Sequence, residues 1–319
     1  MLIVIGGTTA SGKSVLAMRL AERLGAQIVN ADSRQVYCHL GILTAKPTPK
    51  DEGRVLHNLY GYLPPDRQNS VGDWLQRVAP FIDRSRISGQ PLIIVGGTGL
   101  YLKALLEGLP EMPDIPTAVR QKIKAETFEL PTSAIHSMLF DEDPIMAGRL
   151  RPTDRQRNLR ALEVVRATGM SLADWQIRPL KRIKLPVRRK LLAILPDRDT
   201  CARRIEQRFH EMVQIGACDE IAEAIKHYPD LKSLPLSRTT GVSELLGYLE
   251  GRTELASAIR KAIVATRQYA KRQRTWFRHQ APQFQIITDV GDCASLVEQM
   301  MHCEAVGNTD PFKIAAEDC

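Results

Sequence analysis

The residues with the clearest chemistry lie near the start of the chain, in Gly7-Thr8-Thr9-Ala10-Ser11-Gly12-Lys13-Ser14. Their order matches the phosphate-loop pattern GxxxxGK[ST], between an apolar run and an amphipathic segment. Glycines let such a loop curl so that successive N–H groups meet phosphate oxygens at a helix N-terminus. Lys13 adds a cation, and the Ser14 hydroxyl can bind Mg²⁺. These eight residues therefore predict a site for a diphosphate or a nucleotide.

Hydrolysis of a triphosphate does not follow from the loop, because an acidic residue normally ends a neighbouring apolar strand in such enzymes. The best strand, Leu92–Val95, runs into Gly96-Gly97-Thr98 and offers no carboxylate. Asp32 instead follows the short apolar run Gln27–Asn30, and the carboxyl ends of parallel strands meet at one edge of a sheet. Asp32 is therefore a candidate base or a water-mediated Mg²⁺ ligand. The alternative is that it only caps a helix.

The elements around these residues alternate between strand and helix. Strands are predicted for Leu2–Ile5, Gln27–Asn30, Pro91–Val95, Lys190–Leu195 and Ile286–Ile287. Helices are predicted for a segment ending at Gly25, in which Leu16, Leu20 and Leu24 recur every fourth residue, and for Leu100–Leu106, Cys201–His227 and Glu254–Arg278. Strands separated by helices indicate an α/β fold, with a parallel sheet flanked by helices as in P-loop NTPase-like proteins.

Prolines at 110, 113 and 116 interrupt this pattern, and residues 115–182 predict helices with no strand. We therefore expect a small all-helical insertion domain over residues 113–185. The core comes in two parts, 1–112 and 186–303, and residues 304–319 form a frayed tail.

Composition narrows the class of protein. Hydrophobic residues are 44% and charged residues 25% of the 319, which excludes a disordered chain. No apolar run approaches the roughly 20 residues that span a bilayer. The six cysteines are scattered without a CxxC pair, which argues against a zinc ribbon or a disulfide framework. We therefore expect a cytoplasmic protein with no membrane segment.

Positive charge is concentrated in two stretches. Residues 149–190 contain 13 Lys and Arg against three acids, and residues 260–278 contain seven and no acid. The first stretch has a net charge of +10 and the second of +7, which sum to +17. Because the whole chain has a net charge of +8, the remaining residues have a net charge of −9. This separation favours an anionic partner at two places, and the alternative is two solvated helix faces.

Further blocks combine with the phosphate loop into one pattern. They are Asp32–Tyr37, Thr44–Pro47, His57, Val95–Tyr101, Arg149, Pro152–Glu163, Arg204–Arg208 and Thr266–Arg278. In this order the chain resembles the bacterial tRNA dimethylallyltransferases. That family transfers a dimethylallyl group from its diphosphate to N6 of the adenine just 3′ of the anticodon. The resemblance implies this activity, with Mg²⁺ as cofactor, with tRNA and dimethylallyl diphosphate as substrates, and with a monomeric protein.

The resemblance also implies site residues. Asp32 would take the proton of the amine, and Thr98 and Arg208 would bind the diphosphate, whose growing negative charge needs donors and cations aimed at it. Without the resemblance, Arg208 would be one more solvated helix charge, and Thr98 would cap the helix that starts near Leu100. Thr98 could also do both.

The tRNA contacts implied by the resemblance lie in four groups. They are Asp32, Ser33, Arg34, Gln35 and Thr98; Arg120; Gln156, Arg157, Asn158, Leu159 and Arg160; and Arg238, Thr239, Thr240, Gly241, Val242, Ser243, Lys271, Arg272, Gln273, Arg274, Thr275, Trp276, Phe277 and Arg278. The basic helices would hold backbone phosphates while the target adenine leaves its stack. Trp276 and Phe277 could stack on bases, although aromatic residues in a helix are more often core, and we expect at least one to be core.

A few positions depart from the family pattern. Thr8 stands where Pro is usual, Leu43 where Gly is usual, and Asn58 where a second His is frequent. Val242-Ser243 replaces a Tyr-Arg pair. The change at Leu43 predicts a different turn conformation. The chain has no zinc-finger extension, and nothing in it requires Zn.

Three other functions compete with this interpretation. A P-loop small-molecule kinase would explain the loop but not the two basic stretches. A non-catalytic RNA-binding protein would explain the basic stretches but not the intact Lys13, Ser14, Asp32 and Thr98. An enzyme that prenylates free adenine nucleotides would need neither basic stretch.

Overall fold

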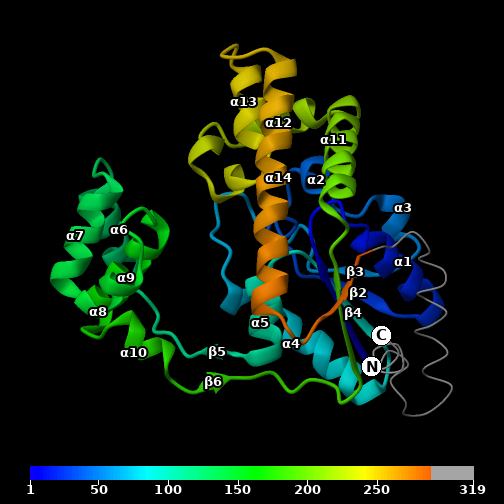
Figure 1. Cartoon of the computed structure of the whole chain (residues 1–319), viewed down its shortest axis with the longest axis horizontal. Coiled ribbons are helices and arrows are strands. Elements are labelled where there is room, and N and C mark those ends of the chain that lie inside the picture. Colours follow the sequence, from blue (N-terminus) through cyan, green and yellow to red (C-terminus); the bar gives the residue numbers. More distant parts are fainter. Residues whose placement is uncertain (289–319) are drawn as a thin grey trace. The chain divides into compact units, whose positions relative to one another are not determined.

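The computed structural model describes residues 1–288 (Figure 1). The described chain divides into a larger unit, residues 1–106 and 184–288, and a smaller unit, residues 107–183. The predicted tail, 304–319, lies outside the described residues. Over residues 1–288, no helix is both long and apolar enough to cross a membrane. The cysteines described there, Cys38, Cys201 and Cys218, are free thiols.

A six-stranded sheet forms the centre of the larger unit, in the order β3-β2-β4-β1-β7-β8. The strands are β1 (Leu2–Gly7), β2 (Gln27–Asn30), β3 (His57–Asn58), β4 (Leu92–Val95), β7 (Arg189–Ile194) and β8 (Gln285–Ile287). Every pair of neighbours is parallel, which confirms the predicted α/β sheet. Leu2–Ile5 of β1 are fully buried, as expected for a central strand that helices cover on both faces.

The helices of the larger unit include all of those predicted for it. They are α1 (Lys13–Leu24), α2 (Gly41–Thr44), α3 (Pro49–Glu52), α4 (Val71–Ser88), α5 (Gly99–Glu107), α11 (Arg198–Gln214), α12 (Ala217–His227), α13 (Val242–Leu249) and α14 (Leu255–Gln280), with 3-10 turns at Leu231–Ser233 and Pro235–Arg238. The α1 helix ends at Gly25, with φ 61°, as its sequence predicts. The predicted helical stretch Cys201–His227 consists of two helices, α11 and α12, because Gly216, with φ 105°, turns the chain between them.

The long helix α14 contacts both the helices α11 and α13 and the sheet (Figure 1). It packs on α13 and α11 along its length and on β1 near its C-terminal end. Phe277 is 1% exposed, and a Cβ on Gly6 of β1 would lie 2.4 Å from its ring. The last turns of α14 therefore lie directly on the strand that leads into the phosphate loop.

The smaller unit is helical, as predicted, but it also contains two short strands. Its helices are α6 (Thr117–Thr127), α7 (Thr132–Glu142), α8 (Pro144–Arg149), α9 (Arg155–Thr168) and α10 (Leu172–Gln176). They enclose Ile123, Ile135, Leu139 and Leu162. The prediction of a strand-free insert was wrong, because β5 (Leu109–Pro110) pairs antiparallel with β6 (Leu180–Lys181). Two-residue strands carry no periodic signal that the sequence could show.

Candidate active site

The phosphate loop joins β1 to α1 in a conformation that its glycines make possible. Gly12 has φ 92°, and Gly7 is so close to β7 that a Cβ would lie 2.4 Å from Ile194 O. Helix α1 starts at Lys13, and its first backbone bond runs from Leu16 N to Gly12 O at 3.1 Å. The N–H groups of the first turn have no acceptor within the helix, so they are available to an anion.

Lys13 lies inside this loop. Its Nζ donates to Thr8 O at 3.2 Å. Burial lowers the pKa of Lys13 to about 8, Asp32 opposes the shift, and Arg208 adds to it. A cation with a depressed pKa gains from any anion that binds beside it, which suits a phosphate site.

Asp32 stands at the carboxyl end of β2, beside the loop. Its N–H donates to Asn30 Oδ1 at 2.7 Å, and its own Oδ1 accepts from Arg34 N at 2.9 Å. Residues 33–36 form a turn and not a helix, so the helix-cap alternative is wrong. The Asp32 charge raises the pKa of both Lys13 and Arg208 against the effect of burial. The carboxylate therefore interacts electrostatically with both cations.

Thr98 connects the ends of β2 and β4. Its Oγ1 accepts from Ser33 N at 2.8 Å and contacts Ser33 Oγ at 3.2 Å. Its backbone carbonyl, not its hydroxyl, accepts from Tyr101 N and Leu102 N at the start of α5. Thr98 therefore begins the helix through its backbone and holds the Asp32 loop through its side chain.

Arg208 reaches the loop from α11. Its Nη2 donates to Thr9 Oγ1, and burial lowers its pKa, against opposing effects of Cys201 and Asp32. Cys201 Sγ, two turns earlier on the same face of α11, donates to Thr9 O at 3.7 Å and lies 3.8 Å from Thr8 Oγ1. The interpretation of Arg208 as a solvated charge is therefore wrong.

Two tyrosines near Asp32 were not predicted from the sequence. Burial raises the pKa of Tyr60 and of Tyr269, and the Asp32 charge raises both further. Tyr60 also lines a cavity of about 170 Å³ beside α1, which it shares with Ser14, Lys46 and His57. A lone tyrosine in a loop or a helix carries no signal of this kind, and only the folded chain brings it to Asp32.

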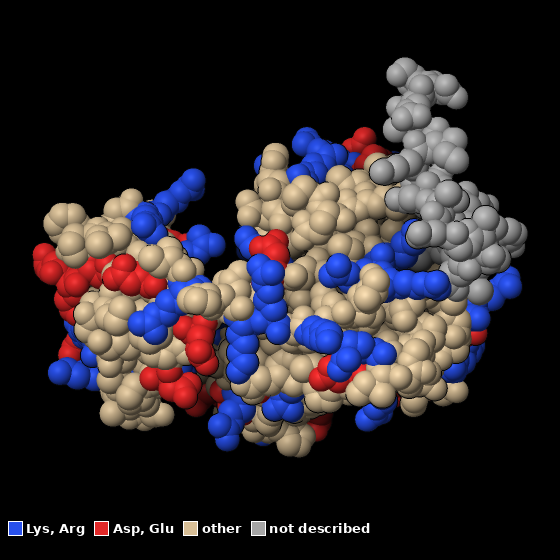
Figure 2. Space-filling view, turned by 90° about the horizontal axis from the view of Figure 1, so that it is seen from below, with Lys and Arg blue, Asp and Glu red and all other residues tan. Residues whose placement is uncertain are grey.

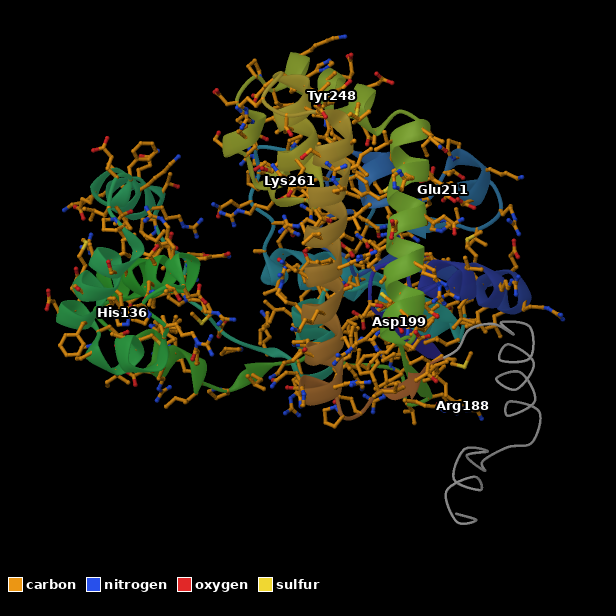
Figure 3. The ribbon with its side chains drawn as sticks, turned by 45° about the horizontal axis from the view of Figure 1, so that its top comes forward. His136, Arg188, Asp199, Glu211, Tyr248 and Lys261 are labelled. Atoms are coloured by element: carbon orange, nitrogen blue, oxygen red, sulfur yellow. The ribbon has the colours of Figure 1, made fainter. Side chains whose placement is uncertain are left out.

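Helix α14 presents two faces. Lys271, Arg272, Thr275 and Arg278 are exposed, while Gln273 and Arg274 are buried beside Phe277. Gln273 bonds to Thr9 N and Gly97 O, and Arg274 donates to Pro196 O. Figure 3 shows α11, with Asp199 and Glu211, beside α14, with Lys261, and Arg267 pairs with Glu206 between them at 2.7 Å.

The predicted tRNA contacts at three α14 side chains need correction. Gln273, Arg274 and Phe277 are at most 8% exposed, so their side chains cannot meet RNA and instead hold α14 on the loop and the sheet. Trp276 is partly buried, and a Cβ on Gly99 would lie 2.2 Å from its ring. Trp276 therefore packs against the start of α5.

The residues of the stretch 238–243 also differ in how exposed they are. Arg238 and Ser243 are exposed and Thr240 is half-buried, whereas Thr239 and Val242 are buried, so the predicted side-chain contacts at those two are wrong. Gly241, with φ 94°, lies so close to Phe209 that a Cβ would be 2.8 Å from its ring. Of the two residues that replace the Tyr-Arg pair, Val242 lies in the core and Ser243 is exposed.

Two other departures from the family pattern have partners in the structure. Leu43 is a buried residue of α2, 7% exposed, in the same core as Val242. Asn58 Nδ2 donates to Gln27 Oε1 at 3.0 Å between β3 and β2.

On the smaller unit, α9 shows Gln156 and Arg157 at its surface, with Arg160 half-buried, and Arg120 on α6 is exposed. Asn158 is fully buried and donates to Arg151 O and Asp154 O, so its predicted RNA contact is wrong. Leu159 is partly buried and packs against the core of this unit, so its predicted RNA contact stays a prediction. On the face drawn in Figure 2, Lys and Arg gather over the larger unit and Asp and Glu form a band on the smaller one.

A magnesium ion fits the donors at the start of α1. Ser14 is exposed there, and the charge of Asp32 acts on the neighbouring Lys13. Hydroxyl, phosphate and water oxygens are the hard ligands that Mg²⁺ prefers. Within residues 1–288, no three His, Cys, Asp or Glu side chains group to hold a metal by themselves. The ion would therefore depend on the phosphates of the substrate for most of its ligands.

Comparison with known proteins places the chain in a family. A family model described as IPP transferase matches residues 35–280. A tRNA dimethylallyltransferase of Chelativorans sp. is 44% identical over 87% of this chain and 94% of its own length, and one of Mesorhizobium japonicum is 43% identical over 94% and 93%. The crystal structure of a tRNA isopentenylpyrophosphate transferase from Bacillus halodurans is 30% identical, with TM-score 0.66 over 95% of each chain. The chain therefore belongs to the IPP transferase family.

Proposed function

We propose that this chain transfers the dimethylallyl group of dimethylallyl diphosphate to N6 of the adenine just 3′ of the anticodon in tRNA, and that diphosphate is released. The observation that carries the proposal is the pair of cations on the phosphate loop, since Lys13 Nζ donates to Thr8 O at 3.2 Å and Arg208 Nη2 donates to Thr9 Oγ1, and the Asp32 charge acts on both. The relatives named tRNA dimethylallyltransferase support it. All of these groups come from one chain, so we expect a monomer to be active.

The loop binds the diphosphate and stabilises it as it leaves. Free N–H groups at the start of α1 point at the phosphate oxygens, while Lys13 and Arg208 supply positive charge. Mg²⁺, bound through Ser14 and the phosphates, would add charge stabilisation when present. These groups are in place before the reaction, so charge that develops on the leaving oxygen needs little rearrangement.

Asp32 accepts the proton of the amine. Arg34 N holds Oδ1 at 2.9 Å, which leaves Oδ2 to accept from N6 of the adenine. As the N6–carbon bond forms, the allylic carbon–oxygen bond breaks, its electron pair goes to the diphosphate, and the N6 proton goes to Asp32. Thr98 keeps the Asp32 loop in position through Ser33.

The exposed Lys and Arg side chains of α14 are the proposed tRNA contacts. Lys271, Arg272 and Arg278 lie on the outer face of α14, whose inner face bonds to the phosphate loop through Gln273. This arrangement puts backbone-binding cations on the same helix that contacts the loop. A small-molecule kinase or an enzyme acting on free adenine nucleotides would not need that outer face.

One experiment separates the candidate functions. Purified protein is given labelled dimethylallyl diphosphate with tRNA, with AMP or alone, and ATP turnover is followed in parallel. We expect label in tRNA and not in AMP, with no ATP turnover. Label in AMP would favour the nucleotide enzyme, ATP turnover the kinase, and RNA binding without transfer the non-catalytic protein.

A further inference from the structure

Every polar backbone and side-chain atom of Thr9 has a protein partner. Its N–H donates to Gln273 Oε1 at 2.8 Å, its carbonyl accepts from Cys201 Sγ at 3.7 Å, and its hydroxyl accepts from Arg208 Nη2. By contrast, the N–H groups at the start of α1 are left for an anion. The loop therefore has two parts. The part at the start of α1 has N–H groups free to bind a ligand, and the part at Thr9, the occupied arm, is bonded to other residues of the protein.

Gln273 is firmly held in this place. It is 6% exposed, and its Nε2 donates to Gly97 O at 3.0 Å. A Cβ on Gly97 would lie 2.2 Å from Nε2, so the carboxamide packs directly on the α-carbon of that glycine. Removing the amide would leave the part-buried Thr9 N–H and the buried Gly97 carbonyl without this partner, which is costly. Gln273 is thus part of the wall of the loop.

The occupied arm lies where a longer phosphate chain would extend. Lys13 Nζ reaches across the loop to Thr8 O at 3.2 Å, next to Thr9. In phosphate loops the backbone N–H groups hold the first two phosphates of the bound chain, and the lysine reaches the second and the third. A diphosphate held at the start of α1 would therefore end at Lys13, and a third phosphate would lie beyond it, toward Thr8 and Thr9, where the Gln273 oxygen already accepts from Thr9 N.

We propose that Gln273 determines the length of the phosphate chain, so that the loop prefers diphosphates to triphosphates. The inference rests on the proposed function, in which the ligand of the loop is a diphosphate. For a triphosphate, the Thr9 N–H is already bonded to Gln273 Oε1. The third phosphate would also be repelled, because its oxygens would face the lone pairs of that Gln273 oxygen. ATP and other triphosphates, which are abundant in cells, are thereby kept out of a site built on a nucleotide-binding loop.

The test compares inorganic diphosphate with inorganic triphosphate, each with Mg²⁺, by calorimetry on the full chain. We expect the wild type to bind the diphosphate more tightly. Gln273→Ala frees the Thr9 N–H, and Gly97→Ala forces the carboxamide away from it. Each should shift the affinity ratio toward triphosphate by about tenfold, the effect of one hydrogen bond to a charged group. Gln280→Ala, an exposed amide on the same helix, should leave the ratio unchanged.

Each outcome decides the matter. A purely structural role for Gln273 would weaken both ligands equally and leave the ratio unchanged. An unchanged ratio in Gln273→Ala and Gly97→Ala, or equal affinities in the wild type, overturns the inference and leaves the transfer reaction standing. If neither ligand binds and no dimethylallyl group is transferred, the proposed function fails and the inference with it. Should Gln273→Ala not fold, the wild-type ratio and Gly97→Ala still decide.

Discussion

Replacing Asp32 by Asn tests the proposed base while keeping the local structure. Asn retains the Oδ1 that accepts from Arg34 N, so the turn after β2 should persist. It cannot take a proton, and base catalysis typically contributes about 10²–10⁴-fold. We therefore expect single-turnover transfer to fall by that factor, which is about 3–5 kcal/mol in the barrier.

The pH of this assay follows from the neighbours of Asp32. The Asp32 charge helps keep Lys13 protonated, and the pKa of Lys13 is already about 8. Losing the carboxylate lowers that pKa further, so near pH 8 the variant would also lose affinity for the diphosphate. Transfer should therefore be measured at pH 6.5, well below the Lys13 pKa of about 8, so that Lys13 keeps most of its charge.

A matched control is Asp66→Asn, since Asp66 is an exposed loop residue of the same unit. It should transfer at the wild-type rate. Asp32→Asn should bind dimethylallyl diphosphate and tRNA with little change at pH 6.5. Near-wild-type single-turnover transfer by Asp32→Asn, with substrate binding intact, would refute the assignment of Asp32 as the base.

Three further variants test other parts of the site. Lys13→Ala should weaken diphosphate binding most at low pH, because the wild-type cation is lost as the pH rises through about 8; calorimetry from pH 6.5 to 9 should show the two proteins converging, and a constant difference would contradict this. Arg272→Ala should reduce the log–log salt slope of tRNA binding by about 0.7, the value for one contact to a single strand; an unchanged slope in filter binding removes it from the interface. Phe277→Ala should destabilise the protein by about 3–5 kcal/mol in urea unfolding, since its ring is buried on Gly6; a cost under about 1 kcal/mol would contradict that packing.

Local patterns were enough to predict the core of the fold. Leu16, Leu20 and Gly25 define α1 because apolar spacing and a left-handed C-cap are properties of a short segment. The pattern failed where the signal is weak or interrupted. Helix α4 contains Pro80, and the two-residue strands β5 and β6 are too short to show a period. Their existence depends on packing and pairing with distant residues.

The phosphate loop and Asp32 could be predicted because their chemistry follows from residue type and from position after a strand. The functions of α11 and α14 could not. Along the sequence, Arg208 is one of several helix charges, and Gln273 and Phe277 are indistinguishable from their exposed neighbours. Only the packing of α11 and α14 on β1 and the loop shows which side chains face Thr9, which face the core and which face solvent.

The sequence by itself therefore predicted the phosphate loop, the candidate base and the family pattern, since each can be recognised from short blocks of consecutive residues. The tertiary structure decided how that site is closed. Thr9 meets Arg208 and Gln273 across 199 and 264 positions of the sequence. A side chain's partner over such a separation is fixed by how helices pack on the sheet, and no local spacing records it.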